Sequence, residues 1–135
     1  MNEILQFLLA HCSFLYETNR FKFVDSLVAE ESFGNALLVL SSSILKLRFV
    51  RDRSQLFLDF QSVQQKGEMH WHSIHTVRQL ITGEKQRSAE LNEDYAAFLR
   101  EHLDEIERRF SKDRLKETLV ALGELERIRA KELPR

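Results

Sequence analysis

The stretch ILKLRFVRDRSQLFLDFQ, residues 44–61, contains two runs in which apolar and polar side chains alternate. A period of two is typical of β-strands that bury one face. A turn centred on Asp52 and Arg53 would join the two runs as an antiparallel hairpin. In that register one side of the hairpin carries the apolar pairs, which are Phe49 with Leu56, Leu47 with Leu58 and Leu45 with Phe60. The other side carries the mixed pairs, which are Arg48 with Phe57 and Lys46 with Asp59.

The segments around this hairpin follow an α+β pattern. An apolar stripe predicts a helix over about residues 2–17, and alternation predicts a strand over 20–26. The dense apolar run 35–43 predicts a central strand, for which a short helix is the alternative. Three later helices are expected. The first begins at an N-cap on Ser73 and ends at Gly83, the second begins at an N-cap on Asn92 and ends near residue 110, and the third follows an N-cap on Ser111.

Strands that cluster together, rather than alternate with helices, indicate the α+β class. We therefore expect one domain over residues 1–135, with an N-terminal helix, an antiparallel sheet of about four strands and three C-terminal helices.

The composition narrows the range of partners and compartments. Lys and Arg number 20 and Asp and Glu number 21, so the basic excess of a typical nucleic-acid binder is absent. The single Cys12 cannot form an internal disulfide, which favours a reducing compartment. The apolar run 4–15 lacks a preceding basic segment and is too short to span a bilayer. We expect a cytoplasmic protein that binds neither nucleic acid nor membrane.

Three histidines occur at H-x-H-x-x-H spacing in MHWHSIH, residues 69–75. The metallo-β-lactamase superfamily uses H-x-H-x-D-H, and His70, His72 and His75 match its histidines. Ile74 occupies the position of its aspartate, however, and isoleucine can neither bind metal nor accept a proton. We therefore reject this resemblance and interpret the stretch as a strand-to-helix junction anchored by Trp71.

A smaller zinc site remains the alternative for the same histidines. On a strand, His70 and His72 would share a face, whereas His75 would lie in the following helix and need not converge with them. Further ligands could come from Glu68, His102 or His11. Our prediction is no metal and no cofactor, with His70, His72 and His75 as the candidate ligands should a metal bind.

The sequence contains no convincing catalytic constellation. Cys12 lies on the apolar stripe of its helix, and neighbouring His11 points in another direction, so we expect Cys12 in the core. The serines at 41–43 lack the glycines of a nucleophile elbow and are better interpreted as a strand end. We predict that the chain is not an enzyme and has no catalytic residues.

The tip of the hairpin is the better candidate for a binding surface. Arginine beside an exposed aromatic side chain is typical of protein interaction hot spots. The candidate partner-binding residues are Arg48, Arg51, Arg53 and Phe57. The alternative is that a helix covers this face and that Arg51 and Arg53 only keep the turn soluble.

The segment SSSILKLRFVRDRSQLFLDFQS, residues 41–62, is followed by Trp71 and by VRQLITG, residues 77–83. Over about residues 8–83 this arrangement resembles small, uncharacterised bacterial proteins of the polymorphic-toxin immunity type. The resemblance implies a protein that binds one cognate toxin and blocks its active site. Immunity proteins against nucleases are often strongly acidic, and this chain is not. No site residue can be carried over, because immunity families share no common binding motif.

Together these observations predict a non-enzymatic protein-binding module, with neutralisation of a toxin as its most specific form. Two alternatives stay open. One is a small metal-dependent enzyme that uses His70, His72 and His75. The other is a homo-oligomeric structural protein, such as a homodimer, that pairs through the hairpin edge or the last helix.

Overall fold

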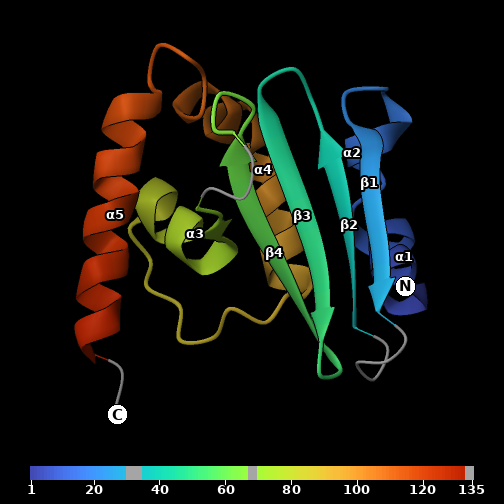
Figure 1. The fold of residues 1–135 in the computed structure, drawn as a ribbon. Helices are drawn as coiled ribbons and strands as arrows, with labels where there is room; N and C mark the ends of the chain where they lie inside the picture. The colour runs from blue at the N-terminus through green and yellow to red at the C-terminus, as the bar shows by residue number, and fades with distance from the viewer. Residues whose placement is uncertain (30–34, 67–69, 133–135) are drawn as a thin grey trace.

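The computed structural model describes residues 1–29, 35–66 and 70–132, and it contains an antiparallel sheet with helices before and after it in the chain (Figure 1). Helices α1 (Asn2–His11) and α2 (Phe14–Glu17) come first. The strands follow: β1 (Lys22–Ala29), β2 (Asn35–Ser41), β3 (Leu45–Asp52), β4 (Gln55–Ser62) and β5 (His72–Ser73). Helices α3 (Ile74–Thr82), α4 (Glu93–Arg109) and α5 (Leu115–Glu132) complete the chain. The predicted α+β class is confirmed.

The five strands form a meander in which each strand pairs with its neighbours in the chain, in the order β1-β2-β3-β4-β5. All four pairings are antiparallel. Residues 35–41 of the run 35–43 therefore form a strand, β2, and not the alternative helix. The two-residue strand β5 was not predicted, because two residues are too few to show a period. β1 lies at one edge of the sheet, which becomes important below.

The hairpin of β3 and β4 exists, but the predicted register is wrong by two residues. Phe49 lies opposite Leu58 and not opposite Leu56. The turn residues are Arg53 and Ser54, whose φ angles are 51° and 70°. Positive φ at both central residues is the backbone of the type I′ turn, which suits the right-handed twist of paired strands. Since side chains alternate with a period of two, a shift of two leaves every residue on its predicted face.

The shift changes the partners on the face that points away from the helices. Arg48 lies opposite Asp59, where the predicted register placed Phe57. Lys46 lies opposite Gln61 and not opposite Asp59. The Arg48–Asp59 ion pair thus takes the place of the predicted Arg48–Phe57 pair. We call this face of the sheet the outer face.

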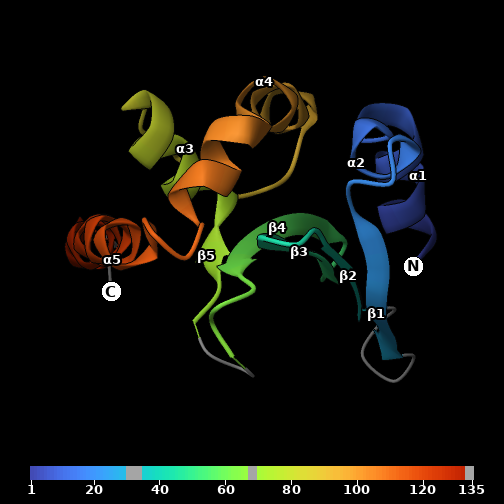
Figure 2. The ribbon, with the colours of Figure 1, turned by 90° about the horizontal axis from the view of Figure 1, so that it is seen from above.

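The core lies between the other face of the sheet and helices α1 to α4, which all lie on one side of the sheet (Figure 2). The strands supply fully buried leucine and phenylalanine side chains, and α1 and α4 supply the opposing layer. The main members are Ile4, Leu8, Leu40, Leu45, Leu47, Phe49, Leu58, Phe60, Tyr95, Leu99, Leu103 and Ile106.

Two helix ends agree with the sequence patterns. Gly83 ends α3 in the left-handed conformation with φ of 79°, which glycine adopts without steric cost. Asn92 caps α4, because its Oδ1 accepts a hydrogen bond from the backbone N–H of Tyr95 at 2.9 Å. Ser73 stands at the N-cap of α3 in extended conformation, but its side chain makes no capping hydrogen bond.

Two other helix predictions need correction. The N-terminal helix is interrupted at Cys12, whose φ of −129° lies outside the helical range, so α1 ends at His11. The last helix begins at Leu115 and is not capped by Ser111. The Ser111 hydroxyl instead donates a hydrogen bond to the Arg108 carbonyl at 2.7 Å, at the end of α4.

Helix α5 buries few of its side chains. It runs beside α3 at the side of the molecule (Figure 1). Of its residues, only Thr118 and Leu122 are buried. Within the described ranges, no helix combines the length and the apolar character that crossing a membrane requires.

Candidate functional site

The outer face carries a continuous row of apolar side chains across four strands. Cross-strand pairing places Leu27 of β1 opposite Leu37 of β2, Leu37 opposite Val50 of β3, and Val50 opposite Phe57 of β4. We call these four residues the apolar row. In the part of the chain that the structure describes, no helix packs on this face (Figure 2). Leu27 is 59% exposed, and the other three are half-buried.

A hollow of about 220 Å³ lies at the β1 end of this row. Leu27, Leu37 and Val50 form its apolar wall. The hollow is completed by residues from the ends of the strands: Ala29, Asn35, Ala36, Arg51 and Asp52. It is large enough for one or two apolar side chains of another molecule.

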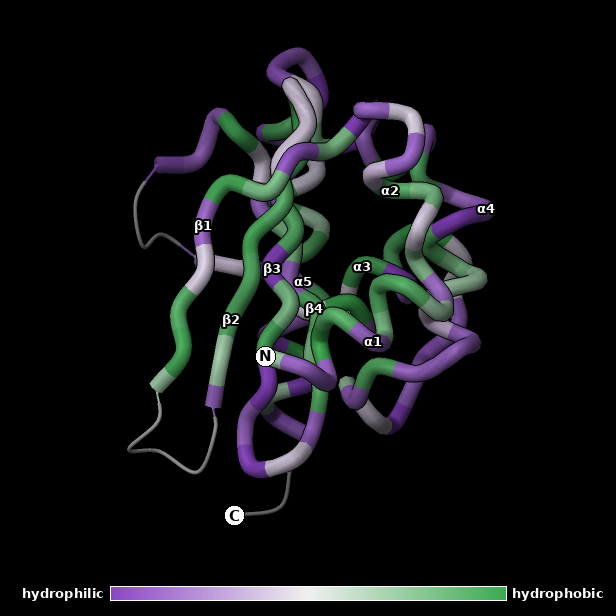
Figure 3. Tube along the Cα trace, turned by 90° about the vertical axis from the view of Figure 1, so that its right-hand side faces the viewer, coloured by the Kyte–Doolittle hydropathy of each residue, from purple (hydrophilic) through white to green (hydrophobic). Residues whose placement is uncertain are grey.

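Strand β1 has a free edge and exposed side chains on both faces, although the Phe23 ring also lies 5.8 Å from the Tyr16 ring of α2. Every residue from Lys22 to Val28 is exposed, although the strand is rich in apolar side chains. Figure 3 shows two hydrophobic stretches in β1, on either side of a polar middle. The exposed large hydrophobic residues are Phe23 at 51%, Val24 at 56%, Leu27 at 59% and Val28 at 47%. An edge strand of this kind offers unpaired backbone groups and apolar contacts to another chain.

The four candidate partner-binding residues do not form a single patch. Arg48 and Phe57 lie on the outer face. Arg51 lies on the opposite face, where its Nε is 3.4 Å from Oε1 of Glu3 in α1. Arg53 lies at the hairpin turn and is exposed. Of the four, only Phe57 belongs to the apolar row.

Arg48 is held in place by two neighbours. Its Nη2 donates a hydrogen bond to Oδ2 of Asp59 at 2.8 Å, and its guanidinium lies 4.4 Å from the centre of the Trp71 ring. Burial raises the pKa of Asp59, while the hydrogen bond and charge of Arg48 oppose that rise. Trp71 thus contacts a cation on the outer face, where an arginine can stack on an aromatic ring.

The histidines of the MHWHSIH stretch divide into two groups. His70 and His72 converge on one carboxylate oxygen of Glu126 in α5, at 3.1 Å from the His70 Nε2 and 2.9 Å from the His72 Nδ1. These three potential ligand atoms all lie within 4.8 Å of one another. His75, in α3, is not a member of this group.

The pKa shifts also separate the group of His70, His72 and Glu126 from His75. Burial raises the pKa of Glu126, but hydrogen bonds from His72 and His70 outweigh it, so the net effect is a lowered pKa. Burial, assisted by the positive charge of Arg129, lowers the pKa of His75 to about 4, against a smaller opposing effect of Glu126. Glu126 is therefore a carboxylate, and His75 is neutral, at pH 7.

Cys12 has the environment of a core residue. Its side chain is fully buried, and burial raises the pKa of the thiol to about 12, although the charge of Arg100 partly opposes this. A thiol of that pKa is not a nucleophile at neutral pH. The prediction that Cys12 is part of the core is confirmed.

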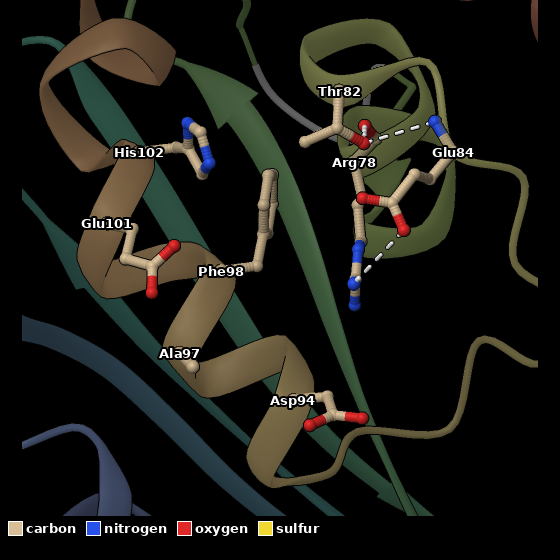
Figure 4. A pocket seen from close by; sticks show the side chains of 8 residues that line it. All are labelled: Arg78, Thr82, Glu84, Asp94, Ala97, Phe98, Glu101 and His102. Atoms are coloured by element: carbon tan, nitrogen blue, oxygen red, sulfur yellow. Dashed lines mark hydrogen bonds and ion pairs between the residues drawn. The ribbon is translucent and has the colours of Figure 1, made fainter.

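A polar cleft of about 290 Å³ lies between α3 and α4 (Figure 4). Three of its residues are linked to one another: the Thr82 hydroxyl donates a hydrogen bond to the Arg78 backbone carbonyl at 2.8 Å, and the Arg78 guanidinium lies 3.8 Å from the Glu84 carboxylate. Thr82 Oγ1 also accepts a hydrogen bond from the Glu84 backbone N–H, and this bond lies at the C-terminal end of α3. The lining is Arg78, Thr82, Glu84, Asp94, Ala97, Phe98, Glu101 and His102. We find no nucleophile–base pair in this cleft.

Sequence reasoning missed two features of these surfaces. It did not find Glu126, which lies far from the histidines in the chain. It also did not single out β1, because its alternation predicts a half-buried strand. No protein-family model, curated protein or solved structure matches the chain. The resemblance to immunity-type proteins therefore stays a prediction.

Proposed function

We propose that this chain is a non-enzymatic, cytoplasmic protein-binding module that pairs its edge strand β1 with an extended segment of a partner protein. The observation that carries this proposal is the exposure of β1, which leaves four large hydrophobic side chains about half uncovered. Natural sheets usually protect their edges with charges, prolines or covering elements. An added strand would satisfy the free backbone groups of β1 and cover its side chains.

The bulge in β1 limits where such a strand can pair. The register shifts between Phe23 and Asp25, which makes the first part of the edge irregular. From Asp25 to Ala29 the pairing with β2 is regular. We place the added strand along this second part, where Leu27 points to the outer face.

The apolar row supplies the side-chain contacts for this mode of binding. A strand added beside β1 would direct every second side chain toward the outer face, next to Leu27. Those side chains would extend the row by one member and reach the 220 Å³ hollow beside it. Backbone hydrogen bonds would provide affinity, and the hollow would provide selectivity.

The charges on the outer face indicate the chemistry of the partner. Lys22 lies opposite Ser41, and Ser41 lies opposite Lys46, so the two lysines share the outer face. Arg48 lies further along the same face. Asp25, opposite Val39, and Asp59, paired with Arg48, lie on the same face, so Lys22 and Lys46 are the cations that an acidic side chain of an otherwise apolar partner segment would meet. Inhibition of a cognate toxin is the specific form of this function that the sequence resemblance favours.

The resemblance to immunity-type proteins implies that a toxin gene lies beside the gene for this chain. The test therefore uses the protein encoded by that neighbouring gene, expressed in an inactive form, as the binding probe. Binding is measured by calorimetry for the wild type, Leu27→Asp and Val120→Asp. Val120 is a matched control, because it is 70% exposed but lies on α5. We expect Leu27→Asp to weaken binding by about 100-fold, because an aspartate must be desolvated against the apolar row, and Val120→Asp to have no effect. Absence of wild-type binding, or equal binding by Leu27→Asp, would refute the proposal.

A homodimer is the second candidate, and one observation favours it. Antiparallel pairing of two β1 strands centred on Leu27 would place this residue opposite its own copy and would join two apolar rows into one. Light scattering separates the candidates. A wild-type dimer that Leu27→Asp converts to a monomer supports self-association, whereas a wild-type monomer that binds the neighbouring gene product supports the first proposal.

A further inference from the structure

Three side chains from two distant parts of the chain meet at one end of the sheet. His72 begins the short strand β5, His70 precedes it by two residues, and Glu126 lies in α5. His72 is 3% exposed, whereas the His70 side chain is 63% exposed. The group therefore has one wall in the protein interior and one side open to water.

We propose that His70, His72 and Glu126 bind one zinc ion that fastens α5 to the sheet. Two imidazole nitrogens and one carboxylate oxygen form a ligand set that zinc accepts, and water would occupy the fourth position. This inference is independent of the proposed protein-binding function, because the site lies at the opposite edge of the sheet from β1.

The distances are close to those of a tetrahedral site. With zinc–ligand bonds of about 2.0–2.1 Å, neighbouring ligand atoms are roughly 3.3 Å apart. The two His–Glu distances are 3.1 and 2.9 Å, and the widest separation in the group is at most 4.8 Å. Entry of zinc would require the His–Glu pairs to open slightly and His70 to turn toward His72. His70 can turn, because its side chain is largely exposed.

The environment of His72 is compatible with coordination through Nδ1. Its other nitrogen, Nε2, is buried and has no hydrogen-bond partner among the described residues. In the zinc-bound tautomer Nε2 carries the proton. The Phe110 ring lies 6.3 Å from the His72 ring in a T-shaped arrangement, a geometry in which an N–H can point toward an aromatic ring.

The small buried part of α5 gives such an ion a structural effect. Thr118 and Leu122 are the buried residues of this helix, and Glu126 lies one turn after Leu122. A zinc ion bound to Glu126 and to both histidines would add a cross-link between α5 and β5, and binding to the folded state alone stabilises that state.

The experiment uses the full chain without a histidine tag, stripped of metal and titrated with Zn²⁺ by calorimetry. We expect one zinc ion per chain and, at free zinc about 100-fold above Kd, a rise in Tm on the order of 8 °C. Glu126→Gln and His70→Ala should each raise Kd by at least about tenfold. Both variants should fold, since the first preserves shape and the second alters an exposed side chain. Circular dichroism checks that they do.

The matched control is His102→Ala. His102 also lies near a glutamate, at 3.9 Å from Glu105, but it belongs to no three-ligand group among the described residues. Its Kd for zinc should equal that of the wild type. The site is refuted if the wild type binds no zinc below about 100 µM, or if Glu126→Gln and His70→Ala bind like the wild type. Hydrogen exchange tests the structural role: zinc should slow exchange in α5, and binding without that effect would refute the fastening of this helix.

Discussion

The Nε of Arg20 donates a hydrogen bond to Oε1 of Glu107 at 2.8 Å, which connects the segment before β1 to α4. The second carboxylate oxygen accepts a hydrogen bond from the Ser42 hydroxyl at 2.5 Å. Glu107 is only 7% exposed. Ser42 in turn accepts the backbone N–H groups of Ile44 and Leu45, so one buried carboxylate organises the turn between β2 and β3.

Replacing this carboxylate should therefore be costly. We expect Glu107→Ala to lower the free energy of unfolding by about 2–3 kcal/mol, because Arg20 and Ser42 lose an acceptor in a largely buried site. Urea denaturation followed by circular dichroism measures the change. Asp104→Asn is the control: Asp104 also pairs with Arg20, but its side chain is 84% exposed, so the effect should stay below about 0.5 kcal/mol. Equal effects of the two variants would contradict this assignment.

The hairpin turn should be open to stabilisation. Arg53 and Ser54 both adopt positive φ, which costs residues other than glycine and asparagine energy. The double variant Arg53→Asn, Ser54→Gly should raise the free energy of unfolding by about 1 kcal/mol. The same urea experiment measures it. Gln55→Gly, at the first residue of β4, should instead destabilise the protein, and stabilisation by this control would show that the turn lies elsewhere.

His75 should make stability depend on pH. Its pKa is about 4 in the folded protein and its ordinary value is 6.5, so the unfolded chain binds a proton more readily. The stability that the folded protein gains by keeping His75 neutral is therefore fully present above pH 6.5, and it is lost as the pH falls toward 4. Because the side chain is only half-buried, we expect a loss of about 1 kcal/mol.

The check is the pH dependence of unfolding in urea for the wild type and His75→Gln. The wild type should lose more stability than the variant between pH 7 and pH 4, since all other titrating groups are common to both. Parallel curves would mean that His75 is not the group responsible.

Cys12 should resist labelling in the folded protein. The thiol is fully buried, and its pKa is about 12, so both access and ionisation are suppressed at pH 8. Ellman's reagent should show no reaction under native conditions and one thiol per chain in concentrated urea. Stoichiometric reaction of the native protein within seconds would contradict the buried position of this residue.

The β3–β4 hairpin shows what a sequence pattern determines and what it leaves open. Alternation assigned Leu47, Phe49 and Leu58 to the core face, and this is correct because the face depends only on whether a position is odd or even in the strand. The register also depends on the turn, and neither Arg53 nor Ser54 has the preference for positive φ that would have marked it. The unrecognised turn at Arg53 and Ser54 therefore accounts for the two-residue error in every predicted cross-strand pair of the hairpin.

The exposure of β1 could not be predicted from alternation alone. The alternation of Phe21 and Phe23 with Lys22 predicts that both phenylalanines share one buried face. Phe21 is 2% exposed and precedes the strand, whereas Phe23 is 51% exposed. The bulge after Phe23 and the position of β1 at the edge of the sheet decide this outcome. Both depend on the assembled sheet.

The group of His70, His72 and Glu126 was predictable in part. A strand period places His70 and His72 on one side, and both indeed contact the same carboxylate. Glu126 lies 54 residues after His72 and reaches it only because α5 packs beside α3. No local spacing carries that information.

The order of the strands in the sheet has a consequence for the synthesis of this protein. Each strand pairs with the one before it, so β1 to β4 can assemble as they leave the ribosome. The helix that covers much of their apolar face, α4, begins at Glu93, about 30 residues after β4 ends at Ser62. At about 5–20 residues per second, α4 begins to be made roughly 2–6 s after β4, and until then α1 but not α4 can cover that face. During this interval the growing chain presents a partly uncovered sheet to the ribosome surface and to chaperones.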